Sequence, residues 1–345
     1  MKIGHFDLQT DGVLIIAELS ANHAKDLSIA KETIRAAKRA GANAVKLQTY
    51  TPDTITIDCQ KPDFLIKGTI WEGKTLYELY EEAYLPWEWH KPLFETAQEE
   101  GLLCFSSPFD RSAVDFLETL EVPAYKIASF EITDIPLIAY VASKQKPVIM
   151  STGIATESDI ALAVETCRKQ GNNQIVLLKT SSQYPAQLHD ANLSMIPDLA
   201  KRFGVLSGLS DHTRGELAPV IATALGGKVI EKHLILDQSI ASPDAGFSLD
   251  ESEFKRMVDA VRKTEKALGK VNYNLSEKAR ESRRFARSLY VVKEMPEGTV
   301  ITEEYVRSIR PGFGLHPKYF NDIVGKKVNR NLKKGMRFSL DYVKF

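Results

Sequence analysis

The sequence of 345 residues contains little cysteine and no long apolar run, and each absence excludes a class of protein. Its only cysteines are Cys59, Cys104 and Cys167, an odd number of widely separated residues without a Cys-x-x-Cys pair. Neither a disulfide framework nor a cysteine-based metal site is therefore expected. Residues 1–7 contain no apolar signal-peptide core, and no uncharged run is long enough to cross a membrane. We expect a cytoplasmic protein without a membrane span.

The sequence also has no excess of charge of either sign, because 45 Lys and Arg balance 45 Asp and Glu. A protein whose main partner is nucleic acid usually has a basic excess, so no nucleic-acid partner is expected. The balance still allows a local basic pocket for a small anion. With 43% hydrophobic and 26% charged residues, the composition is that of a globular protein and excludes collagen-like and disordered classes.

Short apolar runs alternate with longer segments of helical periodicity between about residues 13 and 268. In residues 250–268, for example, Phe254, Met257, Val258 and Val261 recur at helical spacing. Eight strand–helix units within about 250 residues predict a closed (β/α)₈ barrel. The alternative, an open doubly wound sheet that binds a dinucleotide, would carry Gly-x-Gly-x-x-Gly after the first strand, and that motif is absent. The expected strands are residues 13–19, 44–48, 102–106, 124–128, 147–151, 174–179, 205–209 and 228–235.

The pattern divides the chain into three parts. We expect an α/β TIM barrel over residues 1–268, a polar linker over 269–284 and a small β-rich domain over 285–345. Residues 50–86 interrupt the alternation with an aromatic-rich insertion after the second strand. Such an insertion lies on the same rim as an active site, where it is either a lid or an elaboration without a catalytic role.

The C-terminal part contains a short internal repeat. Met295-Pro-Glu-Gly298 matches Leu332-Lys-Lys-Gly335, and Tyr-Val follows each glycine at the same interval, as Tyr305-Val306 and Tyr342-Val343. Two copies of one turn-and-strand unit indicate a small module with an approximate twofold axis.

Three lysines stand inside the apolar runs, where a buried ammonium group must be paired or functional: Lys46, Lys126 and Lys179. Hydroxyl residues end several of the other expected strands. Because the C-terminal ends of barrel strands meet at one mouth, these groups predict a pocket for a multiply charged small anion such as a phosphate or carboxylate. The alternative for each lysine is that it extends to solvent or pairs with a neighbouring glutamate.

Two histidines close consecutive strands, and two imidazoles that face one cavity can bind a divalent metal ion. They are His212 and His233. Alternatively, His212 caps a helix and His233 packs in the core. Two carboxylates stand near them: Glu18 ends the first strand, and Asp244 follows the strand that carries His233. Either carboxylate could orient a metal-bound water or move a proton, and Asp244 could instead serve only a turn.

Two kinds of protein share some of these features. An amidohydrolase-type barrel also uses histidines at strand ends, but it has a His-x-His pair on the first strand, where this chain has Asn22-His23. A non-catalytic carbohydrate-binding protein would account for the C-terminal module, but not for the lysines and histidines at the strand ends.

Motifs along nearly every expected strand are similar to those of the sialic acid synthase family, which condenses phosphoenolpyruvate with an N-acylated sugar. The similarity covers the whole chain, and the C-terminal part resembles the antifreeze-like (SAF) domain. Within the family the chain is most similar to the branch that makes pseudaminic acid, through residues 76–80, 87–90 and 310–317. The motifs are Ile16-Ala17-Glu18-Leu-Ser-Ala-Asn22-His23, Lys46-Leu-Gln48-Thr, Ser106-Ser-Pro-Phe109, Tyr125-Lys126-Ile-Ala-Ser129, Ser151-Thr152-Gly153, Gly208-Leu-Ser210-Asp-His212, Glu231-Lys-His233 and Arg310-Pro-Gly.

This resemblance implies roles for the candidate residues. His212 and His233 would hold a divalent metal, Mn²⁺ before Mg²⁺ or Co²⁺, which binds the aldehyde oxygen of the open-chain sugar. Arg310 would come from the neighbouring subunit of a domain-swapped homodimer and reach an acylamino group. Phosphoenolpyruvate would be held by Ser107, Lys126, Ser129, Ser151, Ser182 and Ser210. Lys46, Gln48, Tyr184 and Asp244 would face the sugar, with Glu18 near the reacting centre, and Glu18, Lys46 and Asp244 are the expected catalytic residues.

The resemblance also implies the substrates. The expected acceptor is 2,4-diacetamido-2,4,6-trideoxy-L-altrose, which gives pseudaminic acid. N-acetylmannosamine and the legionaminate precursor are the alternative acceptors.

Overall fold

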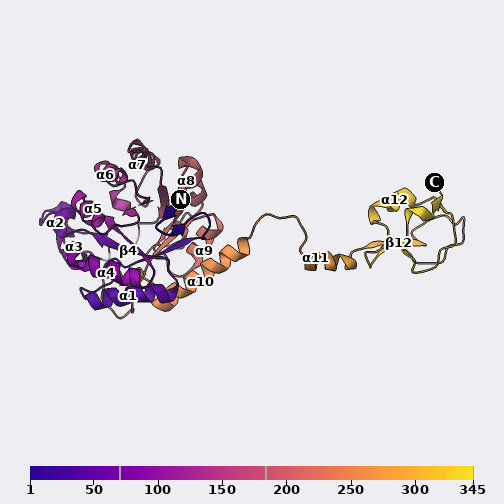
Figure 1. The fold of residues 1–345 in the computed structure, drawn as a ribbon, viewed down its shortest axis with the longest axis horizontal. Coiled ribbons are helices and arrows are strands. Elements are labelled where there is room, and N and C mark those ends of the chain that lie inside the picture. Colours follow the sequence, from indigo (N-terminus) through magenta and orange to yellow (C-terminus); the bar gives the residue numbers. More distant parts are fainter. Residues whose placement is uncertain (70, 183–184, 345) are drawn as a thin grey trace. The chain divides into compact units, whose positions relative to one another are not determined.

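Eight parallel strands close into a barrel in the N-terminal part of the chain, which confirms the predicted TIM-barrel fold (Figure 1). In this computed structural model, which describes residues 1–69, 71–182 and 185–344, the strand order is β10-β3-β4-β5-β6-β7-β8-β9. Each strand overlaps one of the apolar runs. The strands are β3 (Leu14–Glu18), β4 (Ala44–Thr49), β5 (Leu103–Pro108), β6 (Tyr125–Ile127), β7 (Val148–Ser151), β8 (Ile175–Thr180), β9 (Leu206–Asp211) and β10 (Val229–His233).

Helices surround this barrel on the outside (Figure 1). Sequence signals fix their ends: the Asp26 side chain caps the first helix, and Gly41 ends it in the left-handed conformation at φ 91°. Asp250 and Glu253 form a capping box at the start of the last one. The helices are α1 (Leu27–Ala40), α4 (Trp87–Glu99), α5 (Arg111–Glu118), α6 (Ile135–Ser143), α7 (Glu157–Lys169), α8 (Met195–Phe203), α9 (Leu217–Ala224) and α10 (Glu251–Leu268).

Alternate residues of each strand pack on opposite faces of the barrel wall. In β3, Leu14 and Ile16 join one apolar cluster, whereas Ile15 and Ala17 join the other, which includes residues of α1 and α10. The same alternation places Glu18, the last residue of β3, on the inner face. Strand pairing between β10 and β3 then sets His233 directly beside Glu18.

An N-terminal hairpin and the insertion complete this unit. The hairpin strands β1 (Lys2–Ile3) and β2 (Phe6–Asp7) contribute Ile3 and Phe6 to the same apolar cluster as Leu14. Between β4 and α4 the insertion forms α2 (Pro52–Ile55), the 3₁₀ turn η1 (Pro62–Phe64) and α3 (Leu76–Ala83). None of the helices in the described part of the chain is long and apolar enough to span a membrane.

The chain divides into two compact units, residues 1–269 and 270–345. The second contains α11 (Glu277–Ser282), which lies inside the segment expected to be a linker, and the 3₁₀ turn η5 (Arg283–Phe285). Its short strands form two antiparallel pairs. They are β11 (Ser288–Val291) with β12 (Val306–Ile309), and β13 (Lys327–Val328) with β14 (Val343–Lys344); α12 (Phe320–Ile323) lies between the pairs in the sequence.

The two repeat copies pair with each other at equivalent residues. Met295 and Leu332 exchange backbone hydrogen bonds of 2.9 and 2.8 Å. Gly298 N–H donates to the carbonyl of Val328, and Gly335 N–H donates to the carbonyl of Val291, both at 2.8 Å. Because a twofold rotation exchanges each of these contacts with its counterpart, the predicted approximate twofold axis is confirmed.

Candidate functional site

A cavity of about 300 Å³ opens at the C-terminal ends of the barrel strands. It is lined by most of the residues that the sequence nominated: Glu18, Lys46, Gln48, Lys126, Ser129, Ser151, Ser182, Ser210, His212, His233 and Asp244. Ser107 lies behind this lining, where its hydroxyl contacts the Lys46 ammonium at 3.3 Å. Arg310 belongs to the C-terminal unit, and Tyr184 lies outside the described residues.

The floor of the cavity is a buried network of opposite charges. The Lys46 Nζ lies 3.0 Å from Glu18 Oε2 and 3.4 Å from Glu231 Oε1. Glu231 Oε1 also accepts a hydrogen bond of 3.1 Å from the Ser210 hydroxyl, and it lies 3.9 Å from the Lys126 Nζ. Lys126 in turn donates to the Ser151 hydroxyl at 2.7 Å. Two ammonium groups and two carboxylates thus share the space directly below the cavity.

Burial and mutual charge shift the pKa values within this network. Burial raises the pKa of Glu18 to about 7, against the opposing charge of Lys46. Burial also disfavours the charged form of Glu231, but the ammonium groups of Lys126 and Lys46 outweigh it and hold this pKa below its usual value. Burial lowers the pKa of Lys126 to about 8, with a further contribution from the charge of Lys46. Glu18 and Lys126 can therefore change protonation near neutral pH.

The two histidines meet at one edge of this floor, with ring centroids 5.2 Å apart. His212 Nδ1 donates to the Ser181 carbonyl at 2.9 Å, so its lone pair is on Nε2. His233 Nδ1 is buried and has no hydrogen-bond partner among the described residues, and it lies 3.9 Å from Asp244 Oδ2. Burial lowers the pKa of both rings, which keeps them neutral, the form that binds metal ions.

These two rings fit a divalent metal with an incomplete set of protein ligands. No group of three or more His, Cys, Asp or Glu residues suited to a metal ion occurs among residues 1–69, 71–182 and 185–344. A closed structural site is therefore not present in that part of the chain. A metal on His212 and His233 would keep several positions for water and substrate oxygens, as catalytic sites do.

A cradle of polar groups, Gly153, Ser129 and Ser182, forms another part of the cavity. Gly153 N–H donates to the Ser129 hydroxyl at 3.3 Å. A side-chain carbon at Gly153 would lie 2.1 Å from the Ser182 oxygen and 2.8 Å from the Ser129 oxygen, so any larger residue there would displace these hydroxyl groups. The Ser182 hydroxyl is buried without a hydrogen-bond partner in the described part of the chain. A buried hydroxyl without a partner, beside Gly153 in a cavity that Lys126 also lines, suits a bound anion.

The expectation for Lys179 is wrong, and strand alternation explains why. Lys179 does not line the cavity, whereas Thr180, the next residue, and Ser182, which follows the strand, do. Successive residues of β8 point to opposite faces, so Lys179 is directed away and its ammonium donates to the Thr180 carbonyl at 2.9 Å. His23 and Asn22 also stay outside the lining. His23 packs against Trp89, and Asn22 donates to Leu234 and Ser248, as structural residues do.

Among the residues of the site that the sequence did not nominate are three polar ones, Glu231, Glu131 and Ser20. Glu231 is central to the charged floor, whereas the sequence singles it out only as part of the Glu231-Lys-His233 motif. Glu131 lines the cavity, and burial raises its pKa to about 7. Ser20, held at φ 44°, donates its hydroxyl to the Asp244 carboxylate and accepts a bond of 3.0 Å from Gln48. A positive φ at a non-glycine residue is strained and not visible in the sequence, so only the structure reveals Ser20.

Aromatic side chains form another part of the cavity lining, its aromatic wall. Tyr50 makes edge-on contacts with Tyr80 and Phe109, at centroid distances of 5.6 and 5.0 Å. Trp71 also lines the cavity, and its indole N–H donates to the Pro243 carbonyl at 3.3 Å. Tyr50, Trp71 and Tyr80 belong to residues 50–86, so the insertion is part of the cavity and not an elaboration remote from it. The other aromatic lining residues are Phe109, Phe130 and Phe247.

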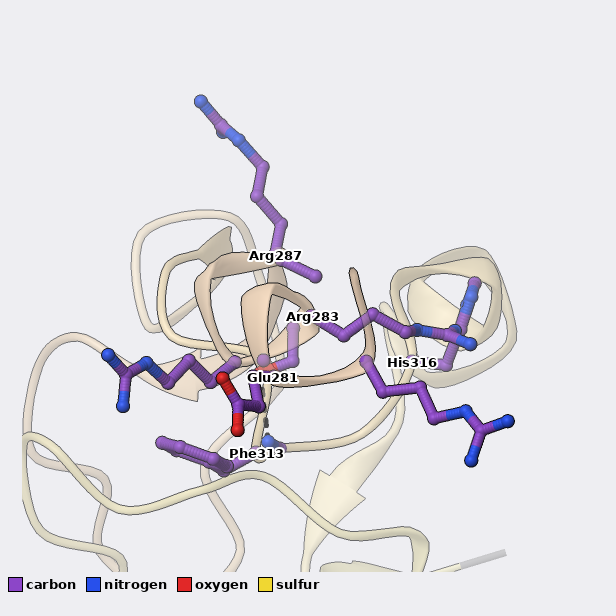
Figure 2. A pocket seen from close by; sticks show the side chains of 11 residues that line it. Glu281, Arg283, Arg287, Phe313 and His316 are labelled. Atoms are coloured by element: carbon purple, nitrogen blue, oxygen red, sulfur yellow. Dashed lines mark hydrogen bonds between the residues drawn. The ribbon is translucent and has the colours of Figure 1, made fainter. Parts of the chain in front are cut away.

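A second cavity, of about 640 Å³, lies within the C-terminal unit (Figure 2). Arg280, Arg283, Arg284 and Arg287 line it together with Phe313 and His316. Figure 2 shows Arg283 and Arg287 extending in different directions, so the guanidinium groups do not surround one point. The arginine side chains are exposed. This cavity is a basic surface and not an enclosed site for one small molecule.

Comparisons with known proteins agree with the geometry. The sequence profile of the NeuB family matches residues 33–273, and that of the SAF domain matches residues 286–336. The chain is 52% identical to a pseudaminic acid synthase of Campylobacter jejuni over 97% of both proteins, and 48% identical to one of Helicobacter pylori over 95% of this chain and 96% of that protein. The crystal structure of the spore coat polysaccharide biosynthesis protein SpsE of Bacillus subtilis is similar with a TM-score of 0.68 and 33% identity, covering 100% of this chain and 99% of that one.

Proposed function

The chain belongs to the NeuB family, and from that premise we propose that it condenses phosphoenolpyruvate with 2,4-diacetamido-2,4,6-trideoxy-L-altrose to give pseudaminic acid and phosphate. The methylene carbon of phosphoenolpyruvate forms a C–C bond with the aldehyde carbon of the open-chain sugar. Water adds to C2 of the phosphoenolpyruvate part, and the C2–O bond to phosphate breaks. The observation that carries this proposal is one cavity in which two neutral histidines face a lysine- and hydroxyl-lined anion site.

The anion cradle suits phosphoenolpyruvate, whose phosphate and carboxylate both need hydrogen-bond donors. In the proposal, Ser129 and Ser182 bind one anionic group beside Gly153, and Lys126 with Ser151 binds the other. Ser210 and Ser107 complete this part of the site through Glu231 and Lys46. Holding both anionic groups fixes the direction of the methylene carbon, which removes much of the entropic barrier to its attack.

The sugar would occupy the side of the cavity near Asp244, Gln48 and the aromatic wall. In the proposal His212 and His233 hold a divalent metal, Mn²⁺ before Mg²⁺ or Co²⁺, which polarises the sugar aldehyde as a Lewis acid when bound. Lys46, Gln48 and Asp244 orient the sugar hydroxyl and amide groups. The contact of Ser20 with Asp244 and Gln48 fixes both side chains before the sugar binds.

Glu18 is placed to handle the proton that the reaction moves. It is buried beside Lys46 and Gln48, and its pKa of about 7 lies near the ambient pH, where proton transfer is most effective. The aldehyde oxygen gains a proton as the C–C bond forms, and the attacking water loses one. Glu18, Lys46 and Asp244 are therefore the proposed catalytic residues.

A phosphate-release assay tests the proposal. Protein, Mn²⁺, phosphoenolpyruvate and a panel of acylamino sugars are incubated, and released phosphate and the nine-carbon product are measured. Release should require both substrates and should stop when the metal is chelated or in the His212→Ala variant. A carbohydrate-binding protein without catalysis would release none. If the protein turns over N-acetylmannosamine or the legionaminate precursor faster than the diacetamido-altrose, the proposed acceptor sugar is wrong but the proposed reaction stands.

The enzyme is further proposed to act as a domain-swapped homodimer in the cytoplasm, where phosphoenolpyruvate is available. The two units have net charges of opposite sign, although the total charge is balanced. Residues 1–269 contain 28 Lys and Arg and 37 Asp and Glu, whereas residues 270–345 contain 17 Lys and Arg and 8 Asp and Glu. The basic surface around Arg283 and Arg287, with the exposed Phe313, has the composition of a protein interface. In the proposed dimer, this basic surface binds the acidic barrel of a second copy. Arg310 of the partner subunit then reaches the sugar.

Subunit mixing tests this arrangement. His212→Ala and Arg310→Ala chains, each nearly inactive alone, are mixed in equal amounts and allowed to exchange. If Arg310 acts in the partner's site, half of the dimers carry one intact site and about a quarter of the normal activity returns. If Arg310 acts within its own chain, mixing restores nothing, and if it has no role at the site, the Arg310→Ala chain is active before mixing.

A further inference from the structure

We propose that the buried Lys232 is a positioning residue that fixes the place of His212, so that the two histidines can share one metal ion. The proposal rests on the metal site of the proposed function, because it concerns how that site is held. Lys232 and its ion-pair partner Asp211 lie in the barrel wall, one residue before His233 and one before His212.

Strand pairing holds the two histidines unequally. Lys232 and Asp211 are the last paired residues between β10 and β9, so both histidines lie just beyond this ladder. His233 remains paired with Glu18 across β10 and β3. His212 is the first residue after β9, at the start of the irregular segment that leads to α9 at Leu217. The position of His212 therefore depends on contacts other than strand pairing.

Lys232 supplies such contacts on both sides of His212. Its ammonium donates to the Asp211 carboxylate, the residue before His212, and to the Thr213 carbonyl, the residue after it. Asp211 Oδ1 also accepts the Thr213 N–H at 3.0 Å. The backbone of His212 is thereby enclosed in a ring of hydrogen bonds anchored on β10. The segment after β8 adds two hydrogen bonds. The Ser181 carbonyl accepts one from the His212 ring, and the Ala186 N–H donates one of 3.1 Å to the His212 carbonyl.

The pair does not face the substrates. Lys232 is 0% and Asp211 3% exposed, and neither lines the cavity, whereas the adjacent Glu231, His233, Ser210 and His212 do. A buried ion pair contributes little net stability, because the desolvation of both charges offsets their attraction. What an apolar pair of the same volume cannot supply is the hydrogen bond to the Thr213 carbonyl. This points to a role in geometry more than in stability.

The test compares metal affinity with stability. Mn²⁺ affinity is measured by calorimetry on metal-free full-length protein, and thermal unfolding is followed with a chelator present. The key variant is Asp211→Asn/Lys232→Met, which removes both charges and keeps the volumes, so no unpaired buried charge remains. We expect it to unfold within a few degrees of the native protein, but to bind Mn²⁺ about 10- to 100-fold more weakly, as loss of a contact behind a metal ligand does.

Two further variants complete the design. Lys146→Met removes a lysine from an ion pair with Glu118 that lies outside the cavity, and its Mn²⁺ affinity should stay within about threefold of native. Asp211→Asn alone keeps the shape of the side chain and should weaken Mn²⁺ binding even if the Lys232 variants do not fold.

The outcomes separate this proposal from the metal site itself. Native Mn²⁺ affinity in the double variant, or in Asp211→Asn if the double variant does not fold, would show a merely structural pair and overturn the proposal. Failure of the native protein to bind Mn²⁺, or equal binding by His212→Ala, would instead overturn the metal site of the proposed function.

Discussion

The floor and the wall of the barrel cavity are built in different ways. The floor consists of charged and hydroxyl groups at strand ends, where Lys46 lies 3.0 Å from Glu18 and the two histidine rings are 5.2 Å apart. The wall consists of aromatic side chains, half of them from residues 50–86, such as Tyr80 and Trp71. The register of the barrel fixes the floor, whereas the insertion can change without disturbing the barrel. This difference suggests that the floor carries the reaction and the wall selects the sugar.

The largest expected effect comes from removing a histidine of the floor. His233→Ala should lower kcat/KM at least about 10³-fold, because it would remove one of the two proposed metal ligands and with it several kcal/mol of stabilisation of the developing charge. Phosphate release with saturating Mn²⁺ measures the loss. His189→Ala is the matched control, since the His189 side chain is 80% exposed and lies outside the cavity, and it should keep native activity. Activity of His233→Ala within tenfold of native would contradict the role of the floor.

The next effect concerns the buried carboxylate beside Lys46. Glu18→Gln keeps the shape and the contact with Gln48 but cannot exchange a proton. We expect kcat to fall about 10²- to 10⁴-fold, the range for loss of a general acid or base. Steady-state kinetics for both substrates measure the change. Glu165→Gln, which breaks an exposed pair with Lys169 on α7, should leave kcat unchanged. An equal loss in both variants would mean that Glu18 has no special role.

A pair of variants tests directly whether the wall binds the sugar and the floor binds phosphoenolpyruvate. Trp71→Ala should raise KM for the sugar about tenfold through loss of buried aromatic surface, and leave KM for phosphoenolpyruvate unchanged. Ser182→Ala should do the reverse, because its buried hydroxyl, which has no partner among the described residues, is the proposed donor to phosphoenolpyruvate. Both constants are obtained from initial rates with the other substrate saturating. Parallel changes in the two constants would mean that wall and floor do not divide the substrates in this way.

The smallest expected effect is on stability and its dependence on pH. Burial raises the pKa of Glu131 to about 7, above the usual value of 4.5. Between these two values the folded protein binds more protons than the unfolded chain, so this group makes stability fall as pH rises through 7. Glu131→Gln should therefore add about 1–2 kcal/mol to the free energy of unfolding at pH 8 and little at pH 4.5. Urea unfolding at both pH values measures the difference, and an equal gain at both would contradict the assignment.

Most of the barrel was predictable from the sequence, because buried parallel strands leave continuous apolar runs and helices leave capping residues such as Asp26 and Gly41. The residues of the floor were found for a related reason: charge inside an apolar run is costly and therefore conspicuous, as with Lys46 and Lys126. The structure brings these groups and both histidines into one cavity.

What the sequence did not reveal depends on the face of a strand or on backbone strain. Lys179 has the same apolar neighbours as Lys126, but it stands one position out of phase and points away from the cavity. Ser20 reaches Asp244 only because its backbone has a positive φ. Half of the aromatic wall comes from an insertion without a regular period. Its contacts, such as that of Trp71 with Pro243, join residues 172 positions apart. No local pattern encodes such contacts.

The reciprocal pairing of Met295 with Leu332 has a consequence for how the C-terminal module can fold. Each copy of the repeat supplies the donor and acceptor groups that satisfy the other, so a single copy would leave buried amide and carbonyl groups without partners. Neither copy is a folding unit alone. Deletion of either one should abolish the ordered structure of residues 286–344 as a whole, an all-or-none loss.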